Sequence, residues 1–531
     1  MNDLQNNSTG MTREEARAFI TAPRTQESKP QVIIPKGHVT ISESAEQLFG
    51  VIGPTNQLFY RDDGVVELIE SNGVYSLRPL DPVRAQSQFE KFVTFMEQKT
   101  INGLRVPYQT KISRAIAEEY LKSDECRRLL PRIHGISQSP LLVERDGILH
   151  LVQSGYDAQS RIYVANNSLV EEIGIEDAVR RLNVLLEEFD FVSGGDKSRA
   201  FASIITPALK LGGLVYGSVP IDVAEANASQ AGKTFRQKLV AAIYNQDLAV
   251  VTRKSGGVGS MEETFNTYLA QGKTFIQFDN VRGTLDSQLL ESFLTAEGSF
   301  AARIPYVGSV GIDPSQHLLY LSSNGFQATK DLANRASIVR INKREGHNYR
   351  QFDGKGLLTH TRKNYMHFLA AVFALVRHWF NQSKPRSSSS LHDFREWEQV
   401  LDWIVVNVLG QAPLMSDHAD AKLRSTNPLL GFVRSIAIAL AIRDRLGQPL
   451  TATQLVDVCQ QEQLDLPGSS ERRASNLAAQ RQTMGKIMGN LFGDTDTLHL
   501  EDYRVRRQAQ PSVTASGNPQ SLNAYVFETV D

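Results

Sequence analysis

The stretch N-A-S-Q-A-G-K-T-F, from Asn227 to Phe235, ends like a phosphate-binding loop. Such a loop needs a strand before it and a helix after it, because its backbone N–H groups and the positive helix end surround the phosphates. L-G-G-L-V-Y-G-S-V-P-I-D-V can supply the strand, and F-R-Q-K-L-V-A-A-I-Y predicts the helix. Asn227 replaces the usual first Gly at a position that often needs positive φ, which Asn tolerates next best. The candidate nucleotide-binding residues are therefore Asn227, Ala228, Ser229, Gln230, Ala231, Gly232, Lys233, Thr234 and Phe235.

The Gly-Lys-Thr tripeptide carries the chemistry of such a loop. Lys233 is expected to reach the β- and γ-phosphates, and the Thr234 hydroxyl is expected to bind Mg²⁺. The same letters, G-K-T-F, recur from Gly272 to Phe275. There a helical pattern comes before the tripeptide and an extended apolar run comes after it. Because that order is reversed, we interpret the second copy as a turn from a helix into a strand.

Two further apolar runs end on polar residues. F-I-Q-F-D-N ends around Asp279, where a P-loop ATPase places the acid that holds Mg²⁺. A strand that ends on Asp before a turn is common, so this run alone is also explained without a site. L-L-Y-L-S-S-N ends on Asn324, and D-L-A-N-R-A-S-I-V-R-I follows with Arg335 and Arg340. A lysine loop, an acid, an asparagine and arginines in this order predict a site for ATP and Mg²⁺.

The length, composition and charge of the chain limit the classes of protein to which it can belong. The chain has 531 residues, 41% hydrophobic and 22% charged, as in ordinary globular proteins of two to four domains. With a net charge of −1, any DNA contact needs a local patch or a ring of subunits. The two cysteines, Cys126 and Cys459, cannot form a disulfide framework or a zinc site. The polar N-terminus has no apolar region of a signal peptide, and no apolar run is long enough to span a membrane, so we expect a cytoplasmic protein without membrane contact.

The pattern of apolar residues changes along the chain. Short apolar runs that alternate with helical segments predict an α/β fold with buried parallel strands. S-K-P-R-S-S-S-S, from Ser383 to Ser390, predicts a flexible linker. The predicted regions are a flexible tail at 1–30, an accessory α+β region at 31–170, an α/β ATPase domain at 171–345, a helical region at 346–446 and a winged-helix-like domain at 447–531.

The order of the motifs resembles that of superfamily 3 helicase-type AAA+ ATPases of phage and plasmid primase-helicases. The resemblance runs from about Arg128 to Arg395 and is weaker toward both ends. The segments that carry it are R-I-H-G-I, S-G-Y-D-A-Q-S-R-I-Y-V, A-S-Q-A-G-K-T, F-D-N-V, E-G-S-F-A-A-R-I-P-Y-V-G-S-V-G-I-D-P, L-S-S-N-G and D-L-A-N-R-A-S-I-V-R-I. It implies an AAA+ P-loop core for residues 171–345.

The resemblance also implies roles for single residues. Asn324 would orient the attacking water, and Arg335 would reach the γ-phosphate of a neighbouring subunit, with Arg340 as a second candidate for nucleotide contact. An arginine that completes the site of a neighbouring subunit implies a hexameric or similar ring. The implied catalytic residues are Lys233, Asp279, Asn280, Asn324 and Arg335, and the implied metal ligands are Thr234 and Asp279.

Candidate DNA contacts lie in two places. The segment from Ser299 to His317 is implied to be a hairpin that lines a central channel. Its expected DNA-binding residues are Arg303, Tyr306 and His317, since a cation pairs with phosphate and an aromatic ring stacks on a base. The alternative is that Tyr306 packs in the core and His317 begins a strand. A basic tail, expected either to contact DNA or to form a solvated face, contains Arg472, Arg473, Arg504, Arg506 and Arg507.

The sequence departs from the family pattern in two ways. Asn280 follows Asp279 where many AAA+ proteins have Glu, and an amide cannot accept a proton from water, although it can orient one. Glu262, Glu263 and Glu297 remain alternative bases. No D-x-D strand precedes residue 200, so the chain resembles a helicase-type ATPase that lacks its primase domain.

We therefore expect a ring-forming, ATP-dependent DNA helicase or translocase of a phage, plasmid or integrated element, acting in replication. A separate primase or replication protein is an expected partner. The alternative is a slow or nucleotide-gated assembly, such as an initiator or antiphage factor, that binds DNA without processive unwinding. A third interpretation is a DNA-binding adaptor that uses only its tail.

Overall fold

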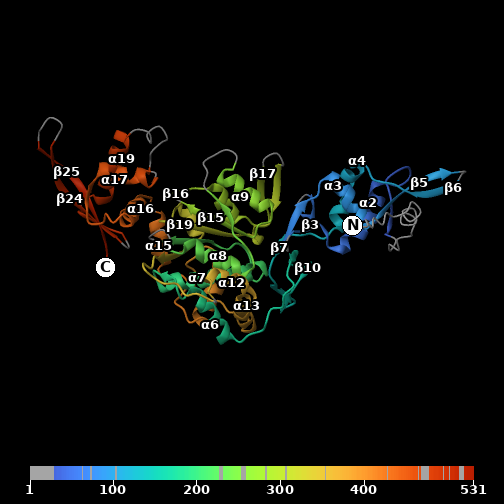
Figure 1. The fold of residues 1–531 in the computed structure, drawn as a ribbon, viewed down its shortest axis with the longest axis horizontal. Helices are drawn as coiled ribbons and strands as arrows, with labels where there is room; N and C mark the ends of the chain where they lie inside the picture. Colours follow the sequence, from blue (N-terminus) through green and yellow to red (C-terminus); the bar gives the residue numbers. More distant parts are fainter. Residues whose placement is uncertain are drawn as a thin grey trace, which may run out of the picture. The chain divides into compact units, whose positions relative to one another are not determined.

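The computed structural model describes residues 29–530 except 62–63, 72–73, 102–103, 227–230, 253–258, 282–283, 305–307, 353, 427, 465, 468–476, 494, 501–502 and 514–518. The chain forms two units, coloured by sequence in Figure 1. The first contains residues up to 60, 64–67 and 79–131, and the second contains the rest. Residues 132–170, which we had grouped with the accessory region, therefore belong to the second unit.

The first unit packs helices against a small sheet of order β1-β5-β6. Thr40 caps α2 through a capping box with Glu43. The rings of Phe49 and Phe89 pack edge to face in its core, with centroids 5.8 Å apart. The first elements of the chain, including a second sheet of order β2-β3-β4, are β1 (Gln31–Ile33), α2 (Ile41–Ile52), β2 (Leu58–Arg61), β3 (Gly64–Ser71), β4 (Val74–Pro79), α3 (Pro82–Phe92), β5 (Thr94–Ile101), β6 (Leu104–Gln109), α4 (Arg114–Lys122) and α5 (Asp124–Leu129).

The second unit begins with two small sheets and is built around a larger one. The small sheets comprise β7 (Gly135–Ser137), β8 (Leu141–Arg145), β9 (Ile148–Val152), β10 (Gly155–Asp157) and β11 (Ile162–Val164). The large sheet has the order β12-β21-β13-β19-β15-β14. Its strands are β12 (Asp190–Phe191), β13 (Ile221–Ala226), β14 (Ala249–Val251), β15 (Phe275–Val281), β19 (Leu318–Ser323) and β21 (Ala336–Asn342).

Five strands of this sheet are parallel, and only the edge strand β12 is antiparallel to its neighbour. The apolar runs L-A-V-V-T, F-I-Q-F-D and L-L-Y-L-S-S, whose pattern predicts buried parallel strands, form β14, β15 and β19. All three are parallel, and β15 and β19 are largely buried, but β14 is an edge strand with Val250 exposed. Parallel strands need crossover connections on the faces of the sheet, so an α/β architecture follows.

Helices cover both faces of the large sheet. On β21, Val339 and Ile341 belong to one hydrophobic cluster, whereas Ala336 and Ile338 belong to another. Because successive residues of a strand point to opposite faces, the two clusters are the two buried faces. The first cluster includes residues of α6 (Ile175–Leu186), α7 (Gly194–Leu211), α8 (Lys233–Ile243), α13 (Tyr365–Asn381) and α14 (Arg395–Asn407). The second includes residues of α9 (Met261–Ala270), α10 (Gln288–Thr295) and α11 (Lys330–Asn334).

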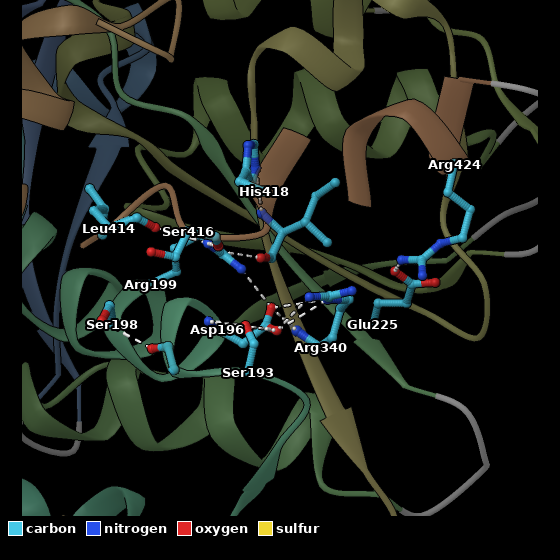
Figure 2. Close-up of polar contacts among 12 residues, drawn as sticks. Ser193, Asp196, Ser198, Arg199, Glu225, Arg340, Leu414, Ser416, His418 and Arg424 are labelled. Carbon is cyan, nitrogen blue, oxygen red and sulfur yellow. Dashed lines mark hydrogen bonds and ion pairs between the residues drawn. The ribbon is translucent and has the colours of Figure 1, made fainter. Parts of the chain in front are cut away.

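A buried ion cluster fixes α7 to the sheet. Asp196 is fully buried and pairs with Arg199 at 2.7 Å and with Arg340 of β21 at 3.0 Å. Arg199 also donates to the carbonyls of Ile338, Leu414 and Ser416, as Figure 2 shows. Burial acts to raise the pKa of Asp196, but the charges of Arg199 and Arg340 outweigh it and hold that pKa below its ordinary value.

Replacing Asp196 with Asn is expected to destabilise the second unit by about 3–5 kcal/mol, since it leaves buried guanidinium groups without their carboxylate. All three tryptophans lie in this unit, so tryptophan fluorescence in urea follows it. Asp247→Asn is the control, because the Asp247–Arg362 pair is exposed, and should cost less than about 1 kcal/mol. Equal midpoints for both variants would contradict the assignment. Because the folded pKa is lowered, the stabilisation holds at neutral pH and is lost as pH falls below about 4.

The C-terminal part adds helices to a four-stranded antiparallel sheet of order β22-β25-β24-β23. The segments L-H-L-E-D-Y-R-V-R-R and A-Y-V-F-E, whose spacing of apolar residues predicts strands, lie on β23 with β24 and on β25. β22 completes the sheet. The elements are α15 (His418–Thr426), α16 (Pro428–Ile442), β22 (Pro449–Thr451), α17 (Ala452–Gln461), α19 (Leu477–Phe492), β23 (Thr497–His499), β24 (Tyr503–Val513) and β25 (Pro519–Thr529). Within the described ranges no single helix is long and apolar enough to cross a membrane, although α15 and α16, bent by 98°, meet that test as a pair.

The expectation of a flexible linker at 383–390 was wrong. The carbonyl of Pro385 accepts a hydrogen bond from Trp379 Nε1 at 2.9 Å. The backbone N–H of Ser387 donates to the carbonyl of Gln399 at 3.0 Å, and Ser389 bonds the carboxylate of Glu398. Composition suggested flexibility, but hydrogen bonds to α14 and to the end of α13 hold the segment in place.

Candidate nucleotide site

The predicted loop connects β13 to α8, as its sequence required. Residues Asn227, Ala228, Ser229 and Gln230 lie outside the described residues. Gly232 follows with φ of 93°, a backbone conformation that favours glycine, and a Cβ there would lie only 3.1 Å from the Phe189 ring. α8 has 11 residues and no side-chain cap at Gly232. The N–H groups at a helix N-terminus suit an anion.

Three neighbouring strands bring the predicted polar residues together. β19 lies between β13 and β15, and all three run in the same direction, so their carboxyl ends meet at one edge. At this edge Lys233 Nζ donates to Asn324 Oδ1 at 2.5 Å. Thr234 Oγ1 donates to Asp279 Oδ1 at 2.9 Å. The side chains that we singled out from separate segments thus form one constellation.

The oxygen atoms around Asp279 suit a hard cation. Ser322 Oγ donates to the same Asp279 oxygen at 2.7 Å and accepts from the backbone N–H of Asn280 at 2.8 Å. Hydroxyl and carboxylate oxygens are the ligands that Mg²⁺ prefers, usually together with substrate phosphates rather than in a protein cage. The described ranges contain no group of three or more His, Cys, Asp or Glu side chains that could hold a metal alone. Ser322 is a residue that sequence reasoning missed.

Asn280 lies in an irregular part of β15, near the carboxyl end of that strand. Its φ is 50°, and the register of β15 against β19 shifts between Phe278 and Val281. Asn tolerates this left-handed conformation better than most residues. Its side chain is exposed, so the bulge turns an amide, not a carboxylate, out of the sheet beside Asp279.

A buried polar network holds α8 in position. Arg236 is fully buried and forms an ion pair with Asp222 of β13. Gln237 Nε2 donates to the carbonyls of Asp222 and Leu321 at 3.1 and 3.0 Å, and Gln277 of β15 donates to Gln237 at 2.7 Å. These bonds join α8 to β13, β15 and β19, which fixes Lys233 and Thr234 relative to Asp279 and Asn324.

Lys233 is only partly accessible, and this changes its acidity. Burial lowers its pKa to about 8, while the negative charges of Asp279 and Glu225 oppose that shift.

In the second G-K-T-F segment, the side chain of Lys273 is exposed. That copy forms a turn between α9 and β15, with Gly272 at φ of 70°, as we predicted.

The two predicted arginines lie in different places. Arg335 ends α11 just before β21, and its carbonyl accepts from the N–H of Ile221 at the start of β13. It is therefore at the opposite end of the sheet from Lys233, roughly 20 Å away along a strand of six residues at about 3.3 Å each. Within the described residues its guanidinium has no hydrogen-bond partner. Arg340 instead pairs with Asp196 in the interior, so its expected nucleotide contact gains no support.

The segment from Ser299 to His317 contains the expected hairpin. β17 (Phe300–Ile304) and β18 (Gly308–Ile312) pair antiparallel, with Arg303 opposite Ser309. Arg303 is exposed, and Tyr306 lies outside the described residues. His317 is only 3% exposed, and its ring contacts the Lys273 carbonyl at 2.8 Å. Burial lowers its pKa to about 4, so it is a neutral core residue, which fits the alternative interpretation rather than DNA contact.

A cavity beside the loop was not foreseen from the sequence. It has a volume of about 480 Å³ and opens next to Gly232 and Lys233. Its wall includes Phe189 and Phe235, whose ring centroids are 6.3 Å apart, and Tyr349. Aromatic walls next to a helix N-terminus suit a flat ring joined to phosphates. The segment K-R-E-G-H-N-Y-R, which follows β21 and contributes Tyr349 to the wall, was the part of the sequence that could have indicated this cavity.

The tail arginines described in the structure are engaged in surface pairs. Arg504 and Arg506 both bond Glu528, and Arg507 bonds Asp496 at 2.9 Å. Arg472 and Arg473 lie outside the described residues. These pairs favour the solvated-face interpretation, because each charge already has a surface partner.

Comparison with known proteins gives weak structural similarity only. No protein-family model and no curated protein matches the sequence. Similar solved structures include the apo A form of the NrS-1 C-terminal region (TM-score 0.37, 12% identity, 90% of this chain and 98% of that one) and the active helicase Cch of SCCmec type IV (TM-score 0.32, 11% identity, 88% and 91%). JCV helicase with a bound organic compound is a third (TM-score 0.20, 12% identity, 48% and 73%). With every TM-score below 0.5, these similarities assign no function to the chain.

Proposed function

We propose that the protein is a superfamily 3-type AAA+ ATPase, a ring-forming DNA helicase or translocase that serves replication of a mobile element. The observation that carries the proposal is the meeting of Lys233, Thr234, Asp279 and Asn324 at the carboxyl ends of β13, β15 and β19. Phosphoryl transfer to water needs groups that hold the phosphates, bind Mg²⁺ and orient the water. Here these groups are the helix end with its lysine, the hydroxyl with the carboxylate, and the neutral amide.

Each residue would contribute a separate part of the reaction. Lys233 would release Asn324 and hold the β- and γ-phosphates, while the N–H groups of α8 stabilise their negative charge. Asn324, freed from Lys233, would orient the attacking water. The aromatic cavity at Phe189 and Tyr349 would hold the base. Mg²⁺, when bound by Thr234 and Asp279, supplies positive charge that stabilises the transferring phosphoryl group.

Ring formation and DNA contact are supported by two placements. Arg335 lies at the end of the sheet opposite Lys233. It would therefore contact a γ-phosphate only if the nucleotide is bound to a neighbouring subunit. The β17–β18 hairpin presents the exposed Arg303, whose charge suits a DNA phosphate. The proposed partners are thus DNA, further copies of the chain, and a separate primase or replication protein.

Asp279→Asn tests the proposed metal site. In the wild type, Mg²⁺ should strengthen ATP binding, and turnover should require it. The variant should lose that dependence, and its turnover should fall by about 100-fold or more, because an amide neutralises less charge. Titration of a fluorescent ATP analogue with and without Mg²⁺ measures the effect. Asp286→Asn, an exposed aspartate nearby, is the control and should leave both quantities unchanged; equal loss in both variants would contradict the site.

A second function is favoured by Asn280. The exposed side chain beside Asp279 is an amide, which cannot accept a proton from water. The protein would then bind ATP and hydrolyse it slowly, as a nucleotide-gated initiator or antiphage assembly without processive unwinding. A turnover that stays slow with single-stranded DNA present, together with tight ATP binding, would favour this second function.

The lowered pKa of Lys233 predicts proton uptake on ATP binding. At pH 8 about half of this lysine is neutral, and nearby phosphates raise its pKa, so binding should take up about half a proton. ATP affinity should accordingly fall as pH rises above 8. Calorimetry in two buffers of different ionisation enthalpy measures the uptake. Lys233→Arg stays protonated and should show none; the same uptake in that variant would contradict the assignment.

A further inference from the structure

The β17–β18 hairpin is held differently at its two ends. Where β17 begins, the Phe300 ring packs edge to face on Phe293 of α10, with centroids 5.2 Å apart. Directly after β18 comes Asp313, whose carboxylate accepts from the backbone N–H of Ser315 at 2.9 Å and caps the short helix η2 (Pro314–Gln316). Apolar packing thus fixes the first end, and a carboxylate fixes the second.

Asp313 also meets a histidine from a distant part of the chain. His134 Nδ1 lies 3.2 Å from Asp313 Oδ2. The backbone N–H of His134 donates to the carbonyl of Arg161 at 2.7 Å, which fixes this histidine next to β11. Burial lowers the pKa of His134, although the charge of Asp313 opposes the shift. The ring is therefore mostly neutral at pH 7, so it can hold Asp313 by a hydrogen bond but adds little positive charge.

Positive charge comes from a buried lysine. Lys210 lies in the last turn of α7, which packs against η2, and is 6% exposed. Burial lowers the pKa of Lys210 to about 8, and the negative charge of Asp313 opposes that shift. His317, which follows η2, is close enough for both charges to act on its pKa but is itself neutral. A buried ammonium group is costly without an opposite charge, so Lys210 and Asp313 stabilise each other's charged forms.

His134, Lys210 and Asp313, which we call the anchor cluster, are remote from the nucleotide site. His317 directly precedes β19, and Asn324 directly follows it. With six residues at about 3.3 Å each, β19 places the anchor cluster roughly 20 Å from Asn324. Substitutions in this cluster should therefore leave ATP binding and basal turnover intact, whereas a displaced hairpin should change DNA contact.

We propose that Lys210 and His134 are positioning residues for the contact between Arg303 and DNA. The inference rests on the proposed function. Lys210 and His134 hold the carboxylate of Asp313 in one orientation, and Asp313 sets the direction in which the hairpin leaves the core. A hairpin that is fixed beforehand loses less conformational entropy when DNA binds, so Arg303 contacts a phosphate more favourably. Without the anchor cluster, only the apolar end at Phe300 stays fixed.

Lys210→Met tests this role, because it removes the charge and keeps an unbranched side chain of similar length. Affinity for single-stranded DNA should fall about fivefold or more, while basal ATP turnover stays within about twofold of the wild type. Arg303→Ala is the reference variant. Each phosphate contact contributes about 0.7 to the slope of log affinity against log salt concentration. Both variants should lose about that much slope, although Lys210 is buried and itself contacts no phosphate.

Lys197→Met is the matched control, because Lys197 lies on the same helix, near its start, and is more accessible. It should leave DNA affinity and slope unchanged. Unchanged affinity in Lys210→Met, or lower affinity with an unchanged slope, would overturn the positioning role alone. Wild-type turnover that does not respond to DNA, or undiminished affinity and slope in Arg303→Ala, would overturn the proposed function of the hairpin and the positioning role with it.

Asp313→Asn provides a second test that holds if Lys210→Met does not fold. Asparagine keeps an oxygen that can accept from Ser315 but removes the charge. Affinity and slope should fall as in Lys210→Met, and the double variant should lose no more than either single variant, because both act through one contact. Additive losses would overturn the link between Lys210 and Asp313. An unchanged slope in His134→Ala would overturn the role of His134.

Discussion

Lys233→Ala is expected to lower ATP turnover by about 100-fold or more while the fold remains intact. The charge of Lys233 lies at the N-terminus of α8, where the phosphates would sit, and nothing else in the described site supplies a mobile ammonium group. Alanine is also a good helix former, so α8 should persist. Phosphate release at saturating Mg-ATP measures the loss, and circular dichroism reports the fold.

The sequence offers a matched control for this variant. Lys273 is the lysine of the second G-K-T-F segment, as Lys233 is of the first, but it lies exposed in a turn between α9 and β15. Lys273→Ala should keep full turnover, because only the order strand-loop-helix builds a phosphate site. Full turnover in Lys233→Ala, or equal losses in both variants, would refute the assignment of Gly232 to Thr234 as the phosphate-binding loop.

Arg335→Ala is expected to abolish hydrolysis but to leave ATP binding within about threefold of the wild type. Arg335 lies at the end of the sheet opposite Lys233, so it cannot contact a nucleotide in its own subunit. A trans-acting arginine contributes about 10³–10⁵-fold to turnover in related chemistry. Equilibrium binding of an ATP analogue and steady-state turnover, measured on the same preparation, separate the two effects.

Mixing the two inactive variants tests whether the arginine acts across an interface. An Arg335→Ala subunit keeps its Lys233, and a Lys233→Ala subunit keeps its Arg335. Mixed rings therefore contain interfaces with one intact site, and part of the turnover should return. Arg344→Ala is a suitable control, because Arg344 lines the cavity of its own subunit and should affect binding instead. Loss of ATP binding in Arg335→Ala would place that residue in its own subunit's site.

Local patterns were enough to predict β15 and β19 of the large sheet and the edge at which they end. Short apolar runs that end on Asp279 and Asn324 are buried parallel strands, and strand direction alone brings their ends together. The two copies of G-K-T-F were separated correctly by the order of helix and strand around them. These predictions succeed because they depend on neighbours in the sequence.

Contacts between distant segments escaped prediction. Arg340 looked like a nucleotide contact until Asp196, 144 residues earlier, was seen to hold it. The serine-rich composition around residues 387 and 389 predicted a flexible linker. The hydrogen bonds of these serines to α14 are tertiary contacts that the local sequence does not indicate. The cavity wall combines Phe189 with Tyr349, and Glu225 meets Arg434 across 209 residues. Such pairs follow from tertiary packing, which composition and periodicity do not encode.

The central claim is that ATP hydrolysis at Lys233 is coupled to DNA. The most direct measurement is ATP turnover by the wild type and Lys233→Ala, each with and without single-stranded DNA. We predict wild-type turnover that rises with DNA, and background turnover in Lys233→Ala under both conditions. Turnover that does not depend on Lys233, or that stays unchanged when DNA is added, would contradict a DNA-coupled motor.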